Sequence, residues 1–289
     1  IKEISIDFTN NDIISTKNMF LGQTSLTKID LNNFQNNITT MEGMFRNCFS
    51  LSSSSFNFLN LNFIKTTNVR YMFSGCSSLT YIKLRKSKFS AITDYSYMFN
   101  DCNHLSNLDL SEFEISNNEN KNYNLYKMFN GCIRLTSIDF SILDISYAIN
   151  YRKLFLDCTS LYNLKLTNFK ANNIVNYSDI FNNLVTVKSI DLSNFEGSKT
   201  ITTTEEMFSN CKNLVYLNLS SFDFYNINNI RRMFSGCSSL ISLDLSNLKT
   251  TYISNFSYLF NDCIKMEYLF ITNFKGSLVK NTMAYMFNN

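Results

Sequence analysis

The strongest constraint on the fold is a Met-Phe pair, or a relaxed form of it, that recurs along the whole chain at steps of 25 to 30 residues. Repeats of this length are typical of solenoids, in which each unit buries its apolar side by stacking on its neighbours. The array leaves almost no residue outside it and predicts a single domain over residues 1–289. The phenylalanines of the pairs are Phe20, Phe45, Phe73, Phe99, Phe129, Phe155, Phe181, Phe208, Phe234, Phe260 and Phe287.

Each repeat contains a pattern that is typical of a short strand. Apolar residues alternate with polar ones around a Leu-Asp-Leu core, as at 243–245 and 108–110. A period of two places alternate side chains on one buried face of a strand. Stacking of the repeats then predicts a parallel sheet along one side of the solenoid.

The second predicted element of each repeat is a helix of about two turns that ends at the Met-Phe pair. Apolar residues stand seven, four and one positions before the Phe, as in Ile227, Ile230, Met233 and Phe234, and this spacing favours one helical stripe. Two positions after the Phe the residue is always Gly, Asn or Asp, which tolerate the left-handed backbone that ends many helices. These predicted caps are Gly22, Asn47, Gly75, Asp101, Gly131, Asp157, Asn183, Asn210, Gly236, Asp262 and Asn289.

Composition excludes several classes of protein. The 27 Phe, 16 Tyr and 45% hydrophobic residues are too many for a disordered chain, and 17% charged residues are few for a coiled coil. A net charge of +3 over this length is far below the strongly basic charge that is typical of a nucleic-acid binder. The single histidine, His104, stands in a variable turn position, and phosphate-loop, serine-elbow and zinc motifs are missing. We therefore expect no enzyme, no catalytic residues, no cofactor, no metal and no nucleic-acid partner.

The eight cysteines share one position of the repeat, three residues after the Phe. Their even number is compatible with disulfides. The same position holds Leu184 in another repeat, which indicates a small buried apolar site, and side chains in register point the same way rather than toward each other. Free, buried thiols are the favoured interpretation, with a disulfide ladder or zinc as alternatives. The cysteines are Cys48, Cys76, Cys102, Cys132, Cys158, Cys211, Cys237 and Cys263.

The sequence Met-Phe-Ser-Gly-Cys-Ser-Ser-Leu at 72–79 and 233–240, continued by Leu-Asp-Leu-Ser-Asn at 243–247, resembles the BspA-like leucine-rich repeat. More narrowly, it is similar to the 26-residue variant of mycoplasma surface lipoproteins and protist surface proteins. The resemblance implies an α/β solenoid, a leucine-rich-repeat right-handed superhelix with a parallel sheet on one face and short helices on the other. It also implies an extracellular or cell-surface protein with an adhesive or host-interacting role.

The outward positions of the predicted sheet form two rows, which are the candidate binding surface for a protein or glycan. One row is charged or polar, and the other carries exposed tyrosines, which make good contact residues. Both rows also fit ordinary strands, because opposite charges on neighbouring strands compensate each other. Calcium between Asp109 and Asp139 is a further alternative, although it needs six or more oxygen ligands. The candidates are Lys28, Asp30, Tyr81, Lys83, Asp109, Asp139, Lys165, Asp191, Tyr216, Asp244 and Tyr268.

Asn37, Asn176 and Asn255 are candidates for N-glycosylation, with the last two in an expected exposed turn, whereas the sequon at Asn218 falls within a predicted strand. Neither end resembles a polar capping repeat, and no signal peptide, lipidation cysteine or transmembrane run is present. We expect an interior part of a longer protein, attached to any membrane through another segment, or ends that stack on other copies. Adhesion or ligand binding is the leading expectation for function. A subunit of an extracellular fibre or coat and an intracellular scaffold are the alternatives.

Overall fold

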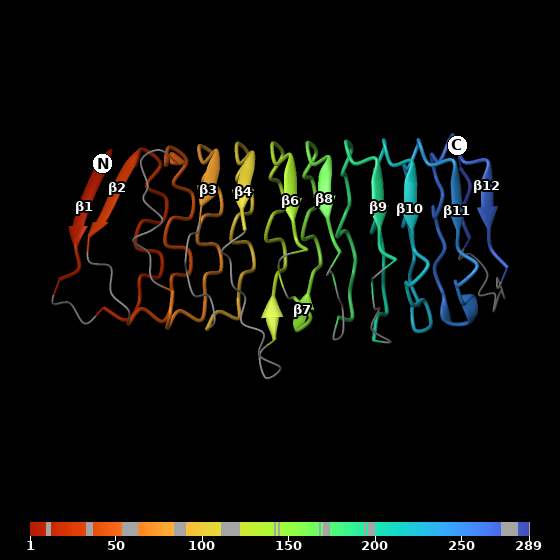
Figure 1. Cartoon of the computed structure of the whole chain (residues 1–289), viewed down its shortest axis with the longest axis horizontal. Coiled ribbons are helices and arrows are strands. Elements are labelled where there is room, and N and C mark those ends of the chain that lie inside the picture. Colours follow the sequence, from red (N-terminus) through yellow and green to blue (C-terminus); the bar gives the residue numbers. More distant parts are fainter. Residues whose placement is uncertain are drawn as a thin grey trace.

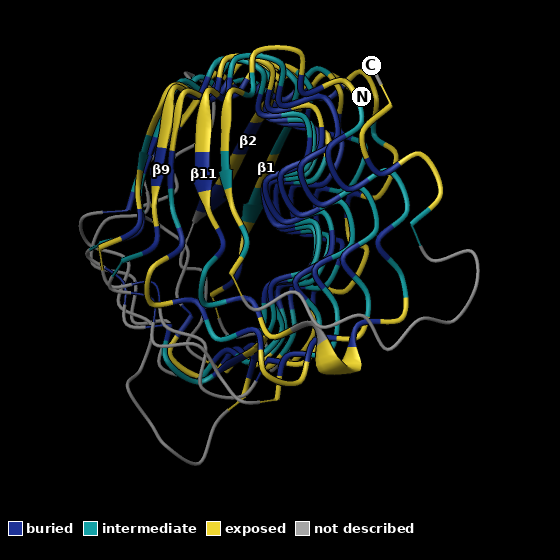
Figure 2. Cartoon of the chain, turned by 90° about the vertical axis from the view of Figure 1, so that its right-hand side faces the viewer, coloured by how far each residue is buried: buried dark blue, intermediate teal, exposed yellow. Residues whose placement is uncertain are grey.

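The computed structural model describes residues 1–9, 13–32, 37–53, 63–83, 91–110, 122–141, 143, 145–167, 169, 174–193, 195, 200–272 and 283–288. The chain winds as one elongated solenoid, and successive repeats follow each other along its long axis (Figure 1). Viewed along that axis, the strands form one side of each coil, and buried residues line the interior (Figure 2). The solenoid predicted from the repeat is therefore confirmed.

The predicted parallel strands are also confirmed. Each pair of hydrogen-bonded neighbours is parallel and in register at equal positions of the repeat. The pairs are β1 (Glu3–Asp7) with β2 (Lys28–Asn32), β3 (Tyr81–Lys83) with β4 (Asn107–Asp109), β6 (Ser137–Asp139) with β8 (Asn163–Lys165), β9 (Ser189–Asp191) with β10 (Tyr216–Asn218), and β11 (Ser242–Asp244) with β12 (Tyr268–Phe270). Another parallel pair, β5 (Tyr123–Asn124) with β7 (Ala148–Asn150), lies away from this row of strands (Figure 1).

The prediction of short helices is wrong. The described residues contain no α-helix, and their one named helical element is η3, a 3₁₀ helix at Thr250–Tyr252. The segment around each Met-Phe pair is instead a chain of overlapping turns. The N–H groups of Met44, Arg46 and Cys48 each bond to the carbonyl three residues earlier, at 3.0 to 3.2 Å. An α-helix needs bonds to the fourth preceding residue, whereas bonds to the third define β-turns.

The amides between these turns bond to the next repeat. Gly43 donates to the carbonyl of Arg70, Phe45 to that of Met72, and Asn47 to that of Ser74, at 2.8 to 2.9 Å. Alternate residues therefore bond within a repeat and between repeats, and the buried backbone is satisfied without a helix. The apolar stripe that predicted a helix still points into the core, because turns of this period bury the same positions.

Two left-handed residues flank each Phe. The predicted one, two positions after the Phe, has positive φ at every described position, while Asn289 lies outside the described residues. The second left-handed residue lies two positions before the Phe and was not predicted from the sequence. It is filled mostly by residues other than glycine, including Tyr71 (φ 58°), Lys127 (φ 54°) and Glu206 (φ 56°). Positive φ at the third residue is what a type II turn requires, and each Phe from Phe20 to Phe260 lies between two turns with such a residue.

Ladders of equal residues fill the core. The Met-Phe rings stack from Phe20 to Phe287, with neighbouring centroids 5.4 to 6.2 Å apart and ring planes within 15° of parallel. A second aromatic ladder follows the strands through Phe140, Phe169, Phe195 and Phe222. Offset stacking of this kind adds to the free energy gained by burial.

Replacing Gly131 by Ala should destabilise the chain more than the same change at Gly22. Both glycines have left-handed backbones, with φ of 73° and 71°. A Cβ at Gly131 would lie 2.4 Å from Oδ1 of Asp101 in the preceding repeat, whereas nothing lies within 4 Å of a Cβ at Gly22. We expect the free energy of unfolding to fall by about 1–2 kcal/mol for Gly22→Ala, and by about 3 kcal/mol for Gly131→Ala because the clash adds. Equal losses in urea unfolding would contradict this packing.

Candidate ligand-binding face

The two predicted rows lie on the outward face of the strands, as expected. In β4, β6 and β8 to β12 the middle side chain points toward the core, and the two flanking side chains point outward, as in the exposed-buried-exposed pattern of β11. The register places Lys83 beside Asp109, Asp139 beside Lys165, and Asp244 beside Phe270. Lys28 and Asp30 lie on β2, next to Glu3 and Ser5 of β1. The side chain of Lys83 lies outside the described residues.

The acidic row has a structural role that the sequence analysis did not identify. Oδ1 of Asp139, Asp191 and Asp244 each accepts the backbone N–H two residues later, at 2.8 to 2.9 Å, and Oδ1 of Asn218 does the same at 3.0 Å. Such Asx turns fix the side chain and start the bend that follows the strand. These side chains are therefore held in one orientation on the face.

Charge compensation between neighbouring strands is confirmed for Asp139 on β6 and Lys165 on β8. Nζ of Lys165 lies 3.1 Å from Oδ2 of Asp139. Partial burial would raise the pKa of Asp139, but hydrogen bonds from Ser141 and Lys165 outweigh it, and the pKa lies below its ordinary value. Hydrogen bonds from Ser246 lower the pKa of Asp244 in the same way. In the described part of the chain no three His, Cys, Asp or Glu side chains are grouped so as to hold a metal ion.

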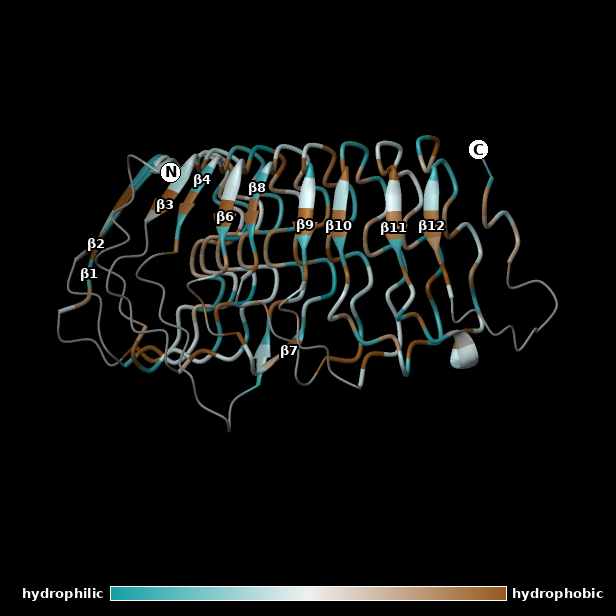
Figure 3. Cartoon of the chain, turned by 45° about the vertical axis from the view of Figure 1, so that its right-hand side comes forward, coloured by the Kyte–Doolittle hydropathy of each residue, from teal (hydrophilic) through white to brown (hydrophobic). Residues whose placement is uncertain are grey.

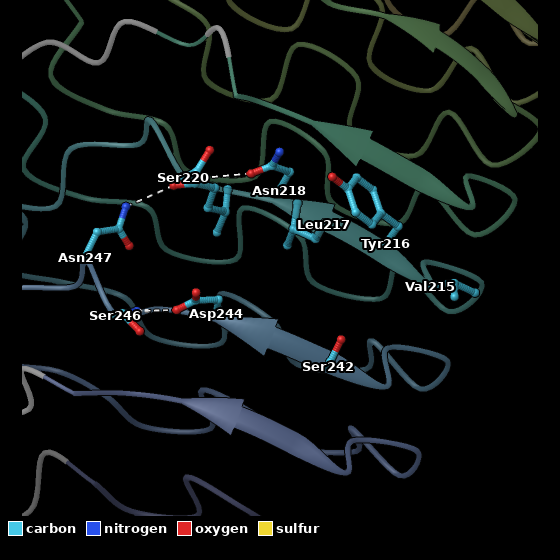
Figure 4. A pocket seen from close by; sticks show the side chains of 10 residues that line it. Val215, Tyr216, Leu217, Asn218, Ser220, Ser242, Asp244, Ser246 and Asn247 are labelled. Atoms are coloured by element: carbon cyan, nitrogen blue, oxygen red, sulfur yellow. Dashed lines mark hydrogen bonds between the residues drawn. The ribbon is translucent and has the colours of Figure 1, made fainter.

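Hollows open on this face where neighbouring strands are not hydrogen-bonded to each other. One of about 450 Å³ lies between β4 and β6, and a smaller one of about 240 Å³ lies between β8 and β9. A hollow of about 440 Å³ lies between β10 and β11, lined by Tyr216, Asn218, Ser242, Asp244 and neighbouring residues (Figure 4). The rows are therefore divided into separate recesses rather than forming one uniform surface.

The C-terminal part of the face is more apolar than the centre. At the first outward position, the central strands carry Asn107, Ser137, Asn163 and Ser189, whereas β10 and β12 carry Tyr216 and Tyr268. Figure 3 shows that the strands of the row carry apolar residues between polar ones, at this end as along the rest of the face. Exposed apolar side chains gathered on one region of a surface are a frequent mark of a binding site. On β10 to β12 and the residues just before these strands, the apolar residues that are 42% to 58% exposed are Val215, Tyr216, Ile241, Tyr268 and Phe270.

A cluster of tyrosines and cations on the turn side was missed by the sequence analysis. Tyr71 stacks on Tyr97 with ring centroids 4.4 Å apart, and Tyr126 meets Tyr97 edge-on at 5.1 Å. The guanidinium of Arg46 lies 4.3 Å from the centre of the Tyr71 ring, and that of Arg70 lies 4.9 Å from it. These side chains cover one another and are only partly exposed, so the cluster stabilises the scaffold rather than presenting open ring faces.

A column of Ser, Thr, Asn or Asp five residues before each Phe was also missed, although its restriction to four residue types is visible in the sequence. Each described side chain of this column accepts the backbone N–H two residues later, as Asn68 does from Arg70 at 2.8 Å. Asn176 and Asn255 belong to this column, accept from Ser178 and Ser257, and are half-buried rather than exposed as predicted. Asn37 is exposed and accepts from Nζ of Lys65. Glycosylation at the three sites stays a prediction.

The prediction of free, buried cysteines is confirmed for all eight. Each thiol donates to the backbone carbonyl of the Phe in the preceding repeat, at 3.0 to 3.2 Å, as from Cys102 to Phe73 and from Cys158 to Phe129. Burial raises the pKa of Cys48 to about 11 and the pKa of Cys211 and Cys263 to about 12. The thiols are therefore structural groups and poor nucleophiles.

Comparison with known proteins yields a family and a fold. The family described as "Mycoplasma protein of unknown function, DUF285" matches residues 4–82, 67–195 and 202–289. A leucine-rich cell surface protein from Faecalibacterium prausnitzii is similar in structure over 94% of this chain and 79% of its own, with a TM-score of 0.50 and 15% identity. A leucine-rich repeat protein from Bacteroides ovatus aligns over 93% of this chain and 86% of its own, with a TM-score of 0.37 and 17% identity. No curated protein matches the sequence.

Proposed function

Because this chain belongs to the Mycoplasma protein family of unknown function DUF285 and is a leucine-rich-repeat solenoid of the BspA-like kind, we propose that it is a non-enzymatic cell-surface protein. We further propose that it binds a protein or glycan ligand with the outward face of its strands. The description of the F. prausnitzii structure as a cell surface protein supports the location. Among the described residues, no helix is long and apolar enough to cross a membrane.

The observation that carries the proposal is the exposed aromatic end of the sheet face. Tyr216, Tyr268 and Phe270 are more than half exposed on strands that the core holds rigidly. Aromatic side chains on a rigid scaffold provide contact area at a low cost in conformational entropy. Asp244 and Asn218, held by Asx turns beside them, add oriented polar groups. The combination fits a recognition surface better than a solvated sheet.

Replacing Tyr81, Tyr216 and Tyr268 together by Ser should abolish binding of the purified chain to cultured epithelial cells, measured by flow cytometry of fluorescently labelled protein. We expect a loss of at least about tenfold in affinity, because exposed tyrosines are frequent hot spots of binding. A matched control replaces Tyr225, Tyr252 and Tyr285, which are similarly exposed but lie off the outward rows. Equal binding by the two triple variants would contradict the proposal.

A second proposal is a fibre or coat formed by end-to-end stacking. It is supported by the direction of the backbone bonds in the turn segments, which run from donors in one repeat to carbonyls in the next, as from Phe129 to Leu154 and from Phe208 to Met233. In the turn segments the two end faces of such a stack are complementary, with backbone donors on one and acceptors on the other. Stacking predicts particles that lengthen with protein concentration in negative-stain images. A monomer in analytical ultracentrifugation at every concentration would contradict it.

A further inference from the structure

We propose that the hollow between β10 and β11 binds a neutral sugar unit of a glycan. This inference rests on the proposed function of the sheet face and names the class of ligand that the site takes. The hollow measures about 440 Å³ and opens where β10 and β11 lie side by side without being hydrogen-bonded to each other. A volume of roughly 300–1,000 Å³ is typical of small-ligand sites.

The polar groups of the hollow are fixed before any ligand arrives. The Asn218 side chain is held by the bond from the Ser220 amide to its Oδ1, at 3.0 Å, and the Asp244 side chain by the bond from the Ser246 amide, at 2.8 Å (Figure 4). Within the described structure, Nδ2 of Asn218 has no protein partner and remains a donor. A carboxylate accepts about four hydrogen bonds, so Asp244 keeps capacity as an acceptor. The Asn218 donor and the Asp244 acceptor together suit the hydroxyl groups of a sugar, each of which both donates and accepts.

An apolar surface stands beside these groups. The Tyr216 ring is 53% exposed at the edge of the hollow, and the exposed Ser242 lies on the neighbouring strand (Figure 4). A pyranose ring has hydroxyl groups at its rim and an apolar C–H face. It can therefore pack this face on an aromatic ring while its hydroxyl groups form hydrogen bonds with polar side chains. Beyond β11, Tyr268 offers a second exposed ring in register with Ser242, where a following sugar could lie.

The charges favour a neutral ligand over an anionic one. Asp244 is the single charged side chain that lines the described hollow, and no lysine or arginine faces it to bind sulfate, phosphate or a sialic acid carboxylate. The hollow between β4 and β6 differs, because the Asp139–Lys165 ion pair lines it and no aromatic side chain does. Of these two hollows, the one between β10 and β11 therefore has the chemistry of a sugar site.

A printed array of neutral, sialylated and sulfated glycans tests the ligand class, and isothermal titration with the strongest neutral oligosaccharide then measures affinity. We expect neutral glycans to bind, and Tyr216→Ala and Asp244→Ala each to weaken binding at least about tenfold. Tyr225→Ala and Asp223→Ala are matched controls, because Tyr225 is similarly exposed, Asp223 makes the same kind of Asx turn, and both lie off the outward rows. Both controls should bind as the unmodified chain does.

Failure on the array, preference for sulfated or sialylated glycans, or equal losses in the control variants would overturn the inference. Enzymatic removal of glycans from the epithelial cells separates this inference from the proposed function. Loss of cell binding after that treatment supports a glycan ligand. Cell binding that survives the treatment but still requires Tyr216 and Tyr268 would show a protein ligand, and would overturn the sugar site while leaving the sheet face as the binding surface.

Discussion

The chain should lose stability steeply as the pH rises above about 9, because its buried thiols resist ionisation. An unfolded cysteine has a pKa of about 8.5, whereas in the folded chain the pKa is about 11 for Cys48 and about 12 for Cys211 and Cys263. Between these values the unfolded state releases protons that the folded state retains, so alkali favours unfolding. The contribution is fully present below the unfolded pKa and is lost as the pH approaches the folded pKa. Each thiol changes the free energy of unfolding by about 1.4 kcal/mol per pH unit, and all eight act in the same direction.

Urea unfolding at a series of pH values measures this slope. The double variant Cys48→Ala, Cys263→Ala provides the comparison, because it removes two thiols near the ends of the array. Its slope should be shallower by about 1.4 kcal/mol per pH unit for each thiol removed. Stability that does not change between neutral pH and the pKa of Cys48, or identical slopes for the two proteins, would contradict the buried thiol ladder.

Replacing Phe129 by Ala should lower the free energy of unfolding by about 3–5 kcal/mol, the usual cost of removing a buried aromatic side chain. The ring is fully buried and stacks between Phe99 and Phe155, with centroids 5.7 and 5.9 Å away, and Phe140 meets it edge-on at 6.0 Å. A repeat in a linear array contacts only its neighbours, so the cavity weakens both interfaces of the repeat that contains it. Amide hydrogen exchange should rise on both sides of residue 129.

The matched variant is Phe287→Ala, which removes a ring from the same ladder where it is 60% exposed. We expect a loss below about 1 kcal/mol there, as for other exposed side chains. Thermal unfolding of both variants checks the difference. Similar losses at the two positions would show that ring stacking, rather than burial and packing, dominates the ladder.

The repeat length and the strand pattern were sufficient to predict the solenoid, the register of the strands and the inward position of the cysteines. The helix prediction failed because a stripe of apolar residues records which positions are buried, not which hydrogen bonds are made. The amide of Phe45 bonds to Met72, in the next repeat along the chain, and no local pattern reports so distant a partner. The second left-handed position could not be predicted, because residues such as Tyr71 and Lys127 have no preference for a left-handed backbone.

The outward rows were predictable because the register of a stacked repeat follows from its period. Their division into hollows was not, since it depends on which neighbouring strands lose their hydrogen bonds. The role of Asp139, Asp191 and Asp244 in Asx turns could have been predicted from the serine two residues after each of them. The same reasoning applies to Asn176, whose Ser178 is at once the end of a sequon and the donor in a turn.

The affinity of a Ser242→Trp variant for epithelial cells tests most directly the claim that recognition occurs on the sheet face around this hollow. Ser242 is exposed, lines the hollow and lies in register with Tyr268, so an indole there should occupy the recess without entering the core. We expect binding to fall at least about tenfold while the thermal unfolding midpoint stays the same. Unchanged binding by the correctly folded variant would contradict it.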